Sequence, residues 1–307
     1  MNRIGRRLVC AGLLLALSGC EYVEGVSEQA RGLYERAQAL YEEYFGVGGK
    51  MRGAKVRLQI FDCGRFTEIN VRPFSLFPYE VALNELFVPC YLVEHAKGKL
   101  LWDAGLPPWI LGKPEGVKVQ DAWVMYYDSS LADQLKAVKL NPWDITHVAF
   151  SHMHFDHVGS ANLFTGATHL IQKLEYDAAF ADPPPELFQR ELYERLERSK
   201  TVKLDGDHDV FGDGRVLILS TPGHTPGHQV LFLDLGETGP IVLSGDLYHF
   251  PESYDLRRVP EFNSDRGQTL ASMDRVEEFL EKRNAELWIQ HDMESAKTLK
   301  MSPKFYE

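Results

Sequence analysis

The sequence predicts a domain of mixed α and β structure with layered sheets, of the α/β or α+β class. Strand-like and helix-like segments intermix along the chain, and such segments bury their apolar faces by stacking in layers. A hydrophobic content of 44% over 307 residues is enough for a sizeable core, and a charged content of 25% is ordinary for a soluble protein. No internal repeat at a fixed period is visible, so we do not expect a solenoid.

The first nineteen residues have the pattern of an export signal. Three arginines precede the apolar run 8–17, which is too short to cross a bilayer as a helix. The sequence Leu-Ser-Gly-Cys that follows resembles a bacterial lipoprotein cleavage box, which implies cleavage before Cys20 and a lipid on its sulfur. Glu21, rather than an aspartate, then implies the outer membrane. We expect a lipoprotein on the periplasmic face of that membrane; the alternative is an ordinary signal peptide and a soluble periplasmic protein.

Residues 20–54 are expected to form an anchor, a helical stalk and a linker. Apolar residues recur at three- and four-residue spacing over 21–47, which predicts a helix that ends at the glycines of 46–49. The same helix could instead be an amphipathic arm that packs on the body of the protein. Residues 55–307 are then left for the main domain.

The mature chain is acidic. Without the three arginines of the signal, 30 basic residues face 44 acidic ones, which gives a net charge of −14. A charge of this sign argues against nucleic acid as a partner.

From residue 55 onward, secondary structure can be predicted in order. Residues 55–61 alternate as in a strand, and residues 85–94 and 99–103 predict a hairpin that turns at Lys97-Gly98. Residues 129–140 predict a helix with a serine cap, ended by Asn141-Pro142. Further strands are predicted at 145–151, 167–172, 216–220, 229–235, 241–244 and 287–290. Helices are predicted at 185–199, which is rich in charge, and at 266–283, which is amphipathic.

The stretch SHMHFDH at 151–157 holds three histidines and an aspartate within six residues. His152 and His154 stand two apart at a strand end, so their side chains point the same way. Asp156 and His157 follow as the chain turns and can face a neighbouring point. An apolar core would leave these groups without partners. The stretch therefore predicts metal binding, with two half-sites in one loop.

The donor types bear on which metal binds. Imidazole and carboxylate without thiolate suit zinc, and also iron, manganese or cobalt. A structural zinc site would more usually contain cysteine, so an open, catalytic site is favoured. More donors follow three later strands, namely His224, Asp246 and His291. Loops at strand ends are where metal and catalytic groups usually sit.

In this order and spacing, SHMHFDHVG, TPGHTPGHQ, SGDLYHF and IQHD resemble the metallo-β-lactamase superfamily. The resemblance covers roughly residues 55–307 and implies an α+β fold, the αββα sandwich, with a dinuclear metal site at one edge. It implies one ion held by His152, His154 and His224, a second held by Asp156, His157 and His291, and Asp246 as the bridge. It also implies that Asp103, in LWDAGLP, orients a metal ligand.

Within the superfamily the chain is most similar to N-acyl-homoserine lactone lactonases, through FVPCYLVE, KLLWDAGLP and the ending PKFYE. This implies a small-molecule lactone or related ester, opened by metal-bound hydroxide, with Asp156 or another carboxylate moving a proton. These lactonases carry a tyrosine three residues after the bridging aspartate. Here His249 has that spacing and Tyr248 stands one residue earlier, so Tyr248 or His249 is expected to meet the substrate carbonyl.

Two other functions stay open. The same fold and ligands would serve a hydrolase of a thioester, a phosphoester or a β-lactam. A lipoprotein that binds metal without turnover is the third hypothesis, although seven ligands exceed what sequestration requires. The sequence shows no serine elbow and no Walker loop, so it does not support a serine hydrolase or an NTPase. Acyl-chain preference and oligomeric state are not predicted.

Other residues have less distinctive patterns. Cys63 and Cys90 would pair in an oxidising periplasm or remain two separate buried thiols. His228 is expected to support or pack beside the ligands, and His95, His147, His169 and His208 have ordinary contexts. Aromatic side chains that could line an acyl pocket, or simply belong to the core and surface, are Phe74, Phe77, Trp102, Trp109, Trp123, Tyr126 and Tyr127.

Overall fold

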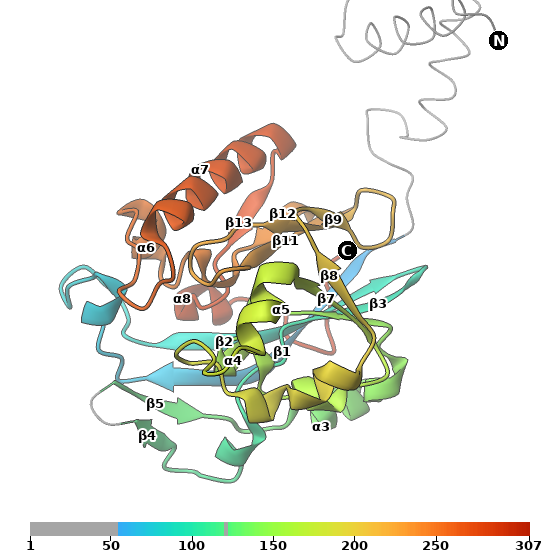
Figure 1. Ribbon diagram of the computed structural model, residues 1–307, viewed down its shortest axis with the longest axis horizontal. Helices are drawn as coiled ribbons and strands as arrows, with labels where there is room; N and C mark the ends of the chain where they lie inside the picture. Colours follow the sequence, from blue (N-terminus) through green and yellow to red (C-terminus); the bar gives the residue numbers. More distant parts are fainter. Residues whose placement is uncertain (1–54, 120–121) are drawn as a thin grey trace, which may run out of the picture. The chain divides into compact units, whose positions relative to one another are not determined.

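Two sheets stacked face to face carry the site, with helices on their outer sides (Figure 1). The computed structural model describes residues 55–119 and 122–307. The predicted signal, Cys20 and the 21–47 helix lie outside these residues. Within the described part, no helix combines the length and apolar character needed to cross a membrane. The α+β sandwich predicted from the resemblance is confirmed.

The first sheet has eight strands in the order β4-β5-β1-β2-β3-β6-β7-β8. The β2–β3 hairpin turns as predicted, with His95 opposite Gly98. From β3 through β8 the neighbouring strands run parallel. The bounds are β1 Arg57–Thr67, β2 Leu86–His95, β3 Gly98–Trp102, β4 Val117–Val119, β5 Trp123–Tyr126, β6 His147–Ala149, β7 Thr168–Gln172 and β8 Thr201–Leu204.

The second sheet has five strands in the order β13-β12-β11-β10-β9. Only the β12–β13 pair is parallel among its described pairs. The bounds are β9 His208–Asp209, β10 Val216–Ser220, β11 Gln229–Leu235, β12 Gly239–Leu243 and β13 Glu286–Trp288.

Most helices are short and lie at strand ends. The exception is α7, which begins and ends at the predicted residues and is capped by the Asp265 carboxylate accepting from the Gln268 amide. The α-helices are α3 Leu131–Ala137, α4 Phe155–Val158, α5 Lys173–Ala179, α6 Pro251–Asp255, α7 Arg266–Arg283 and α8 Met293–Ala296. The 3₁₀ turns are η1 Arg72–Phe74, η2 Pro108–Ile110, η3 Pro142–Asp144, η4 Ala161–Leu163, η5 Arg190–Leu192, η6 Glu194–Arg198 and η7 Gly245–Leu247.

Three apolar clusters hold these layers together. The middle cluster fills the space between the sheets and contains Trp102, which is fully buried. A second joins α7 to the outer face of the second sheet, through Val276 and Phe232. A third joins α3 and α5 to the outer face of the first sheet. The sandwich is thus held by burial of apolar area on both faces of both sheets.

The prediction of one helix over 185–199 is wrong. Prolines 183–185 provide no backbone donors, and Leu187 has a left-handed backbone with φ of 67°. The chain instead forms η5 and η6, separated by Tyr193, whose buried hydroxyl donates to the Ala179 carbonyl at 3.0 Å. Tertiary burial of this tyrosine therefore replaces a continuous helix.

A disulfide joins Cys63 of β1 to Cys90 of β2, with the two Cα atoms 5.8 Å apart. Both residues are fully buried. Of the two alternatives left open by the sequence, the structure has the paired one.

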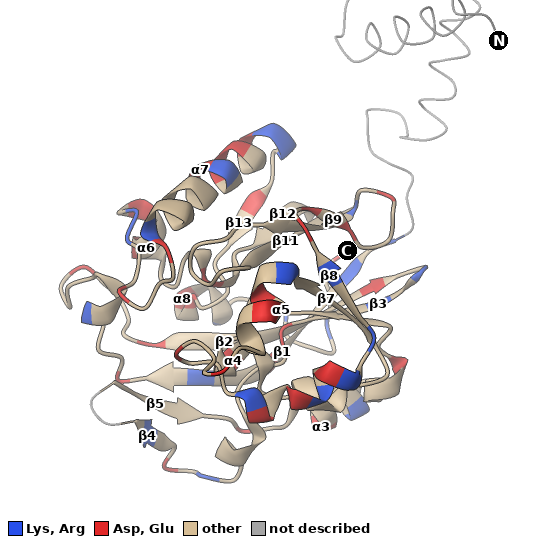
Figure 2. Cartoon of the chain, in the orientation of Figure 1, with Lys and Arg blue, Asp and Glu red and all other residues tan. Residues whose placement is uncertain are grey.

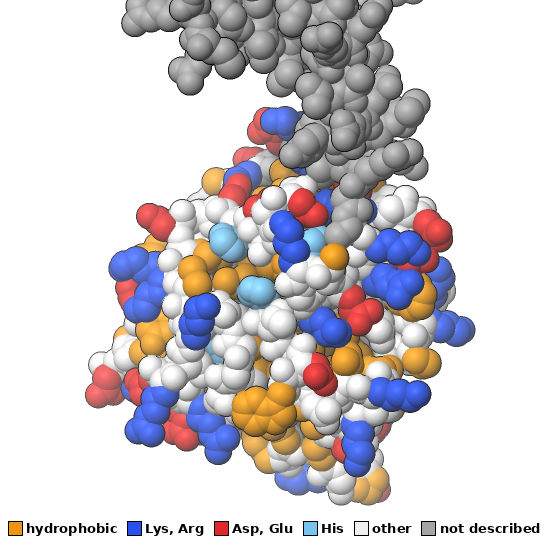
Figure 3. All heavy atoms as spheres, turned by 90° about the vertical axis from the view of Figure 1, so that its right-hand side faces the viewer, with side chains coloured by type: hydrophobic (Ala, Val, Ile, Leu, Met, Phe, Trp, Pro, Cys, Tyr) orange, Lys and Arg blue, Asp and Glu red, His pale blue; other side chains and the backbone are white. Residues whose placement is uncertain are grey.

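Charges of both signs are interspersed over the surface of the described residues. Figure 2 shows acidic and basic residues together on α7, and the face in Figure 3 mixes both with apolar patches.

Candidate metal centre

The His-rich loop leaves β6 in extended conformation and then turns into α4. His154 is the residue before α4, with φ and ψ of −66° and 154°. Because the chain before α4 is extended, the imidazoles of His152 and His154 point to the same side. His152 Nε2 lies 2.8 Å from His154 Nδ1. Asp156 and His157 belong to α4 and therefore face a different point.

The first half-site consists of His152, His154, His224 and Asp246. One donor atom from each lies within 4.8 Å of the others, and all four residues are buried. His224 Nε2 is 3.2 Å from His154 Nδ1, and Asp246 Oδ2 is 3.4 Å from His224 Nε2.

The second half-site consists of Asp156, His157 and His291, with donor atoms again within 4.8 Å of one another. His157 Nε2 lies 3.3 Å from His291 Nε2. Asp246 reaches this group with its other oxygen, because Oδ1 lies 3.1 Å from His157 Nε2 and 2.9 Å from His291 Nε2. The Asp246 carboxylate thus stands between the half-sites, as a bridging ligand would.

Each half-site draws on both sheets. The His152–His157 loop follows β6 of the first sheet, whereas His224, Asp246 and His291 follow β10, β12 and β13 of the second. These rigid strand ends bring together seven donors that are far apart in sequence.

The electrostatics fit cations at both points. Burial lowers the pKa of His152 and of His154 well below the ordinary value, which keeps imidazole lone pairs available as ligands. Burial would raise the pKa of Asp246, but the surrounding imidazoles, His157 foremost, hold it well below its usual range. In the second half-site burial would lower the pKa of His157 and of His291, but the nearby carboxylates, Asp246 foremost, raise both above the ordinary value. The negative potential at that point suits a cation. The donor set therefore fits two divalent metal ions, as the sequence predicts.

Asp103 supports the second half-site through the ring nitrogen of His157 that faces away from the other donors. Its Oδ2 lies 2.9 Å from His157 Nδ1, and its two oxygens also accept from the Ser151 amide and hydroxyl. Gln290 Nε2 donates to the same carboxylate at 2.9 Å, while Gln290 Oε1 accepts from Trp102 Nε1 and from the Gly245 amide. This network orients the His157 imidazole and ties it to the loop that bears Asp246.

His228 also acts on the loop that bears Asp246. Its Nε2 accepts from the Asp246 backbone N–H at 3.0 Å, and its Nδ1 faces the Thr221 hydroxyl at 2.9 Å. Burial lowers the pKa of His228 to about 3, so it is a neutral acceptor. It supports a ligand and belongs to neither donor group.

The structure separates the two candidates for the substrate carbonyl. Tyr248 has extended backbone, so it and His249 point to opposite sides. The Tyr248 side chain packs in the α7 cluster, and its hydroxyl donates to Glu277 at 3.2 Å. The expectation that Tyr248 reaches the metal site is therefore wrong. His249 does reach it, with Nε2 3.0 Å from Asp246 Oδ2.

A small cavity of about 50 Å³ opens over the donors. Its floor contains His154, Asp156, Asp246, His249 and His291. Its walls are apolar and consist of Phe66, Ile69, Phe74, Leu86, Trp123, Phe155, Leu187 and Phe262.

The other candidate aromatics lie elsewhere than this cavity. Trp102 is in the core, and Trp109 and Phe77 are partly exposed, at 47% and 40%. Tyr127 is buried, with its hydroxyl accepting from the Leu131 amide, and Tyr126 stacks under Arg65. Only Phe74 and Trp123 of the predicted set therefore line the cavity.

The remaining histidines have separate surroundings. His95 pairs with Asp213 at 3.0 Å and stacks on Phe211. His147 meets the edge of the same ring. His169 is buried against Phe150, and His208 is in β9. None of these belongs to the two donor groups, as predicted.

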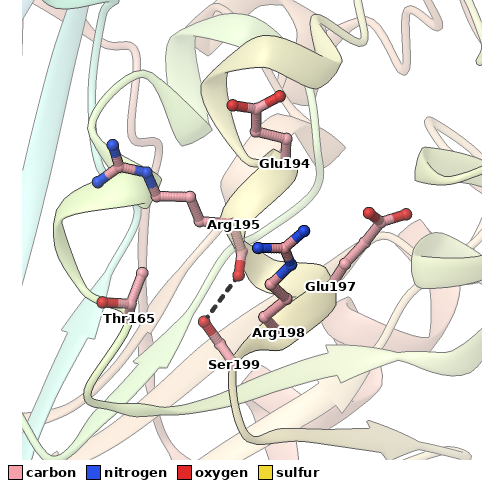
Figure 4. Close-up of a pocket in the computed structure, with 6 residues that line it drawn as sticks. All are labelled: Thr165, Glu194, Arg195, Glu197, Arg198 and Ser199. Atoms are coloured by element: carbon pink, nitrogen blue, oxygen red, sulfur yellow. Dashed lines mark hydrogen bonds between the residues drawn. The ribbon is translucent and has the colours of Figure 1, made fainter.

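A larger hollow of about 480 Å³ shares no lining residue with the metal centre. It is lined by charged side chains of η6, Thr165 and Ser199, and the Ser199 hydroxyl donates to the Arg195 carbonyl at 3.0 Å (Figure 4). Chemistry is assigned to the smaller cavity, because the metal donors converge there.

Sequence reasoning overlooked Glu175 and Gln290. Glu175 is 1% exposed and follows a strand that ends near the site, and Gln290 directly precedes a ligand. No sequence pattern singles out Glu175, because Lys173 and Asp177 make its surroundings those of an ordinary helix surface.

The αββα sandwich with a buried two-ion donor set at one edge defines a metal-dependent hydrolase. The model of the Metallo-beta-lactamase superfamily matches residues 83–283, and the chain belongs to this family.

Within this family, the chain is similar to several N-acyl homoserine lactonases. The chain is 31% identical over 234 residues to the N-acyl homoserine lactonase AttM of Rhizobium radiobacter, covering 72% of this chain and 88% of that protein. It is 31% identical over 232 residues to an N-acyl homoserine lactonase of Bacillus thuringiensis, covering 73% and 88%. A solved N-acyl homoserine lactone hydrolase, with the product N-hexanoyl-L-homoserine at its catalytic metal centre, superposes with a TM-score of 0.70 at 29% identity, covering 82% of this chain and 99% of that one.

Proposed function

We propose that the protein opens the ring of N-acyl-homoserine lactones by hydrolysis with two bound divalent ions, zinc foremost. The observation that carries this proposal is the apolar-walled cavity whose floor is the metal donor set. The pattern of its lining, apolar walls beside a few convergent polar groups, is that of a small-molecule site and places an apolar acyl chain beside a polar ring at the ions. Its volume of about 50 Å³ holds only part of such a substrate, so the walls must open to admit the whole molecule. The lactonase relatives that match over most of the described domain support the same substrate class.

The reaction adds water across the ring C–O bond. The water oxygen joins the carbonyl carbon, the ring C–O bond breaks, and the ring oxygen takes a proton to give an N-acyl-homoserine. The ions, when bound, would polarise the carbonyl and lower the pKa of the attacking water.

His249 is assigned to the carbonyl oxygen. It lines the cavity beside Asp246, and Phe74 and Phe262 surround its ring at 5.0 and 5.6 Å between centroids. An imidazole N–H held in this way can donate to the negative charge that develops on the carbonyl oxygen.

Asp156 is assigned to the transfer of a proton to the leaving ring oxygen. Its carboxylate lies at the cavity floor, with one oxygen 3.5 Å from His157 Nε2. From this position it can take a proton from the attacking water and pass it to the leaving ring oxygen.

A substrate panel tests the proposal. The purified protein with Zn²⁺ should hydrolyse N-acyl-homoserine lactones faster than a thioester, a phosphodiester or a β-lactam. His249→Phe should lower kcat for the lactones by about 100-fold, the lower end of the loss when one oxyanion donor is removed. Faster turnover of any of the other three substrates, with no opening of the lactone ring, would replace the lactonase assignment.

We further propose that the mature chain is a lipoprotein anchored through Cys20 on the periplasmic face of the outer membrane. The signal pattern of residues 1–20 supports this, and so does the Cys63–Cys90 disulfide, because disulfides persist in oxidising compartments. Mass spectrometry of the mature N-terminus should find acyl groups on Cys20, and Cys20→Ser should move the protein from the membrane fraction to the soluble one. An unmodified N-terminus would leave a soluble periplasmic protein.

A further inference from the structure

Glu175 is a buried carboxylate that belongs to neither donor group. It lies in the first turn of α5, with 1% of its surface exposed. Its two oxygens accept one backbone N–H each, Oε1 from Met153 at 2.8 Å and Oε2 from Gly227 at 2.8 Å. Burial raises its pKa to about 7, and the Thr225 side chain and the two amides work against that rise. Burying an ionisable group costs free energy unless hydrogen bonds compensate for the lost water, so these contacts hold Glu175 in a defined position.

The two amides belong to two ligand loops. Met153 stands between His152 and His154, and Gly227 lies three residues after His224. One carboxylate therefore connects the loops that carry all three histidines of the first half-site. The connection crosses between the sheets, since one loop follows β6 and the other follows β10.

Gly227 independently shows that this contact is close. A Cβ atom at position 227 would lie 2.5 Å from the Glu175 backbone nitrogen and 2.6 Å from its Cβ. Real Cβ atoms do not approach backbone so closely, so the loop can rest on α5 only with glycine here.

We infer that Glu175 is a positioning residue that sets the spacing of His152 and His154 against His224 in the first half-site. Residues that orient metal ligands through hydrogen bonds typically change metal affinity by 10- to 100-fold when replaced. The inference rests on the two-ion centre and not on the identity of the substrate.

Glu175→Gln is the informative variant because it keeps the volume. A glutamine has one acceptor oxygen, so one of the two amides would face an NH₂ group instead. Glu175→Ala removes both acceptors, and Gly227→Ala perturbs the same contact from the loop side. Asp177→Asn is the matched control, since Asp177 lies on the same helix, is exposed, and pairs with Lys173 and Lys203.

The experiment counts bound Zn²⁺ per full-length chain after dialysis against increasing chelator. The unaltered protein and Asp177→Asn should release both ions over the same chelator range. Glu175→Gln should release one ion at about 10- to 100-fold lower chelator concentration, with the second ion unchanged. X-ray absorption should then find the retained zinc with two imidazole ligands, because the second half-site supplies two histidines and the first supplies three.

Three outcomes would overturn the inference. They are unchanged release of both ions, equal weakening of both ions, and failure of Glu175→Gln to fold while Asp177→Asn folds. Because the readout uses Zn²⁺ alone, it stays valid if the chain hydrolyses a substrate other than a lactone.

Discussion

The two half-sites share one carboxylate but are supported in different ways. The loops of the first meet at Glu175, which accepts from two backbone N–H groups and also interacts with the Thr225 side chain. The second is backed by Asp103, which faces four polar groups: the Ser151 amide and hydroxyl, His157 Nδ1 and Gln290 Nε2. His291 is also fixed, with its Nδ1 2.6 Å from the Phe87 carbonyl. A more fully connected network leaves fewer ways to relax, so we expect the second half-site to keep its ion more firmly.

Removing the shared ligand should abolish the difference between the half-sites. Asp246→Asn takes away the carboxylate that approaches both, so both ions should weaken. Hydrolysis should fall by about 10³-fold or more, because ions contribute several kcal/mol to the transition state and 1.36 kcal/mol is tenfold. The measurement is kcat/KM together with bound metal per chain. Retention of full activity would contradict a bridging role.

The stability that Glu175 contributes should depend on pH. The pKa of Glu175 in the folded protein is about 7, above the ordinary 4.5. The folded state therefore binds this proton more tightly, and the resulting stability is fully present below about pH 4.5 and is lost as pH rises through 7. The loss amounts to about 3 kcal/mol.

Urea unfolding of the metal-stripped protein and of Glu175→Gln at pH 5 and pH 8 measures this contribution. Relative to Glu175→Gln, the unaltered protein should lose about 2.5 kcal/mol of unfolding free energy between pH 5 and pH 8. Parallel pH curves would mean that Glu175 titrates normally.

Weakening the second support should give the mirror image of the Glu175 result. Asp103→Asn replaces one acceptor oxygen by a donor and misorients His157, so the second ion should bind about 10- to 100-fold more weakly. The first ion should weaken less, through the Ser151 hydroxyl, which donates to Asp103 and lies 3.1 Å from His152 Nδ1. The same chelator series measures it, with the retained zinc now showing three imidazole ligands. Loss of the first ion instead would reverse the comparison.

The smallest effect is expected at Tyr248, outside both half-sites. Tyr248→Phe removes a hydroxyl that donates to Glu277 at 3.2 Å. Stability should fall by about 1 kcal/mol, and hydrolysis should stay within about twofold of the unaltered protein. A much larger loss of kcat would mean that Tyr248 takes part in catalysis after all.

The sequence predicted the sandwich and the donors because their signals are local. His152, His154, Asp156 and His157 stand together, and His224, Asp246 and His291 each follow an apolar strand. The α7 helix was predictable to the residue because a capping residue, Asp265, precedes it and apolar residues recur along it at helical spacing.

What could not be predicted depends on contacts between distant segments. Glu175 acts on amides 22 and 52 residues away, and a backbone N–H leaves no trace in sequence. Whether Tyr248 or His249 faces the ions depends on the direction of one extended residue after η7. The pairing of Cys63 with Cys90 required the register of β1 against β2. The 185–199 helix failed because burial of Tyr193 outweighed local helix propensity.

The division of each half-site between two sheets has a mechanical consequence. An ion held by His154, after a strand of the first sheet, and by His224, after a strand of the second, would link the two sheets at this edge and stabilise the folded chain. Ligands that bind only the folded chain stabilise it in proportion to the logarithm of their concentration. The cell's supply of the metal would then govern how long the folded chain survives proteolysis, as well as how fast it turns over substrate.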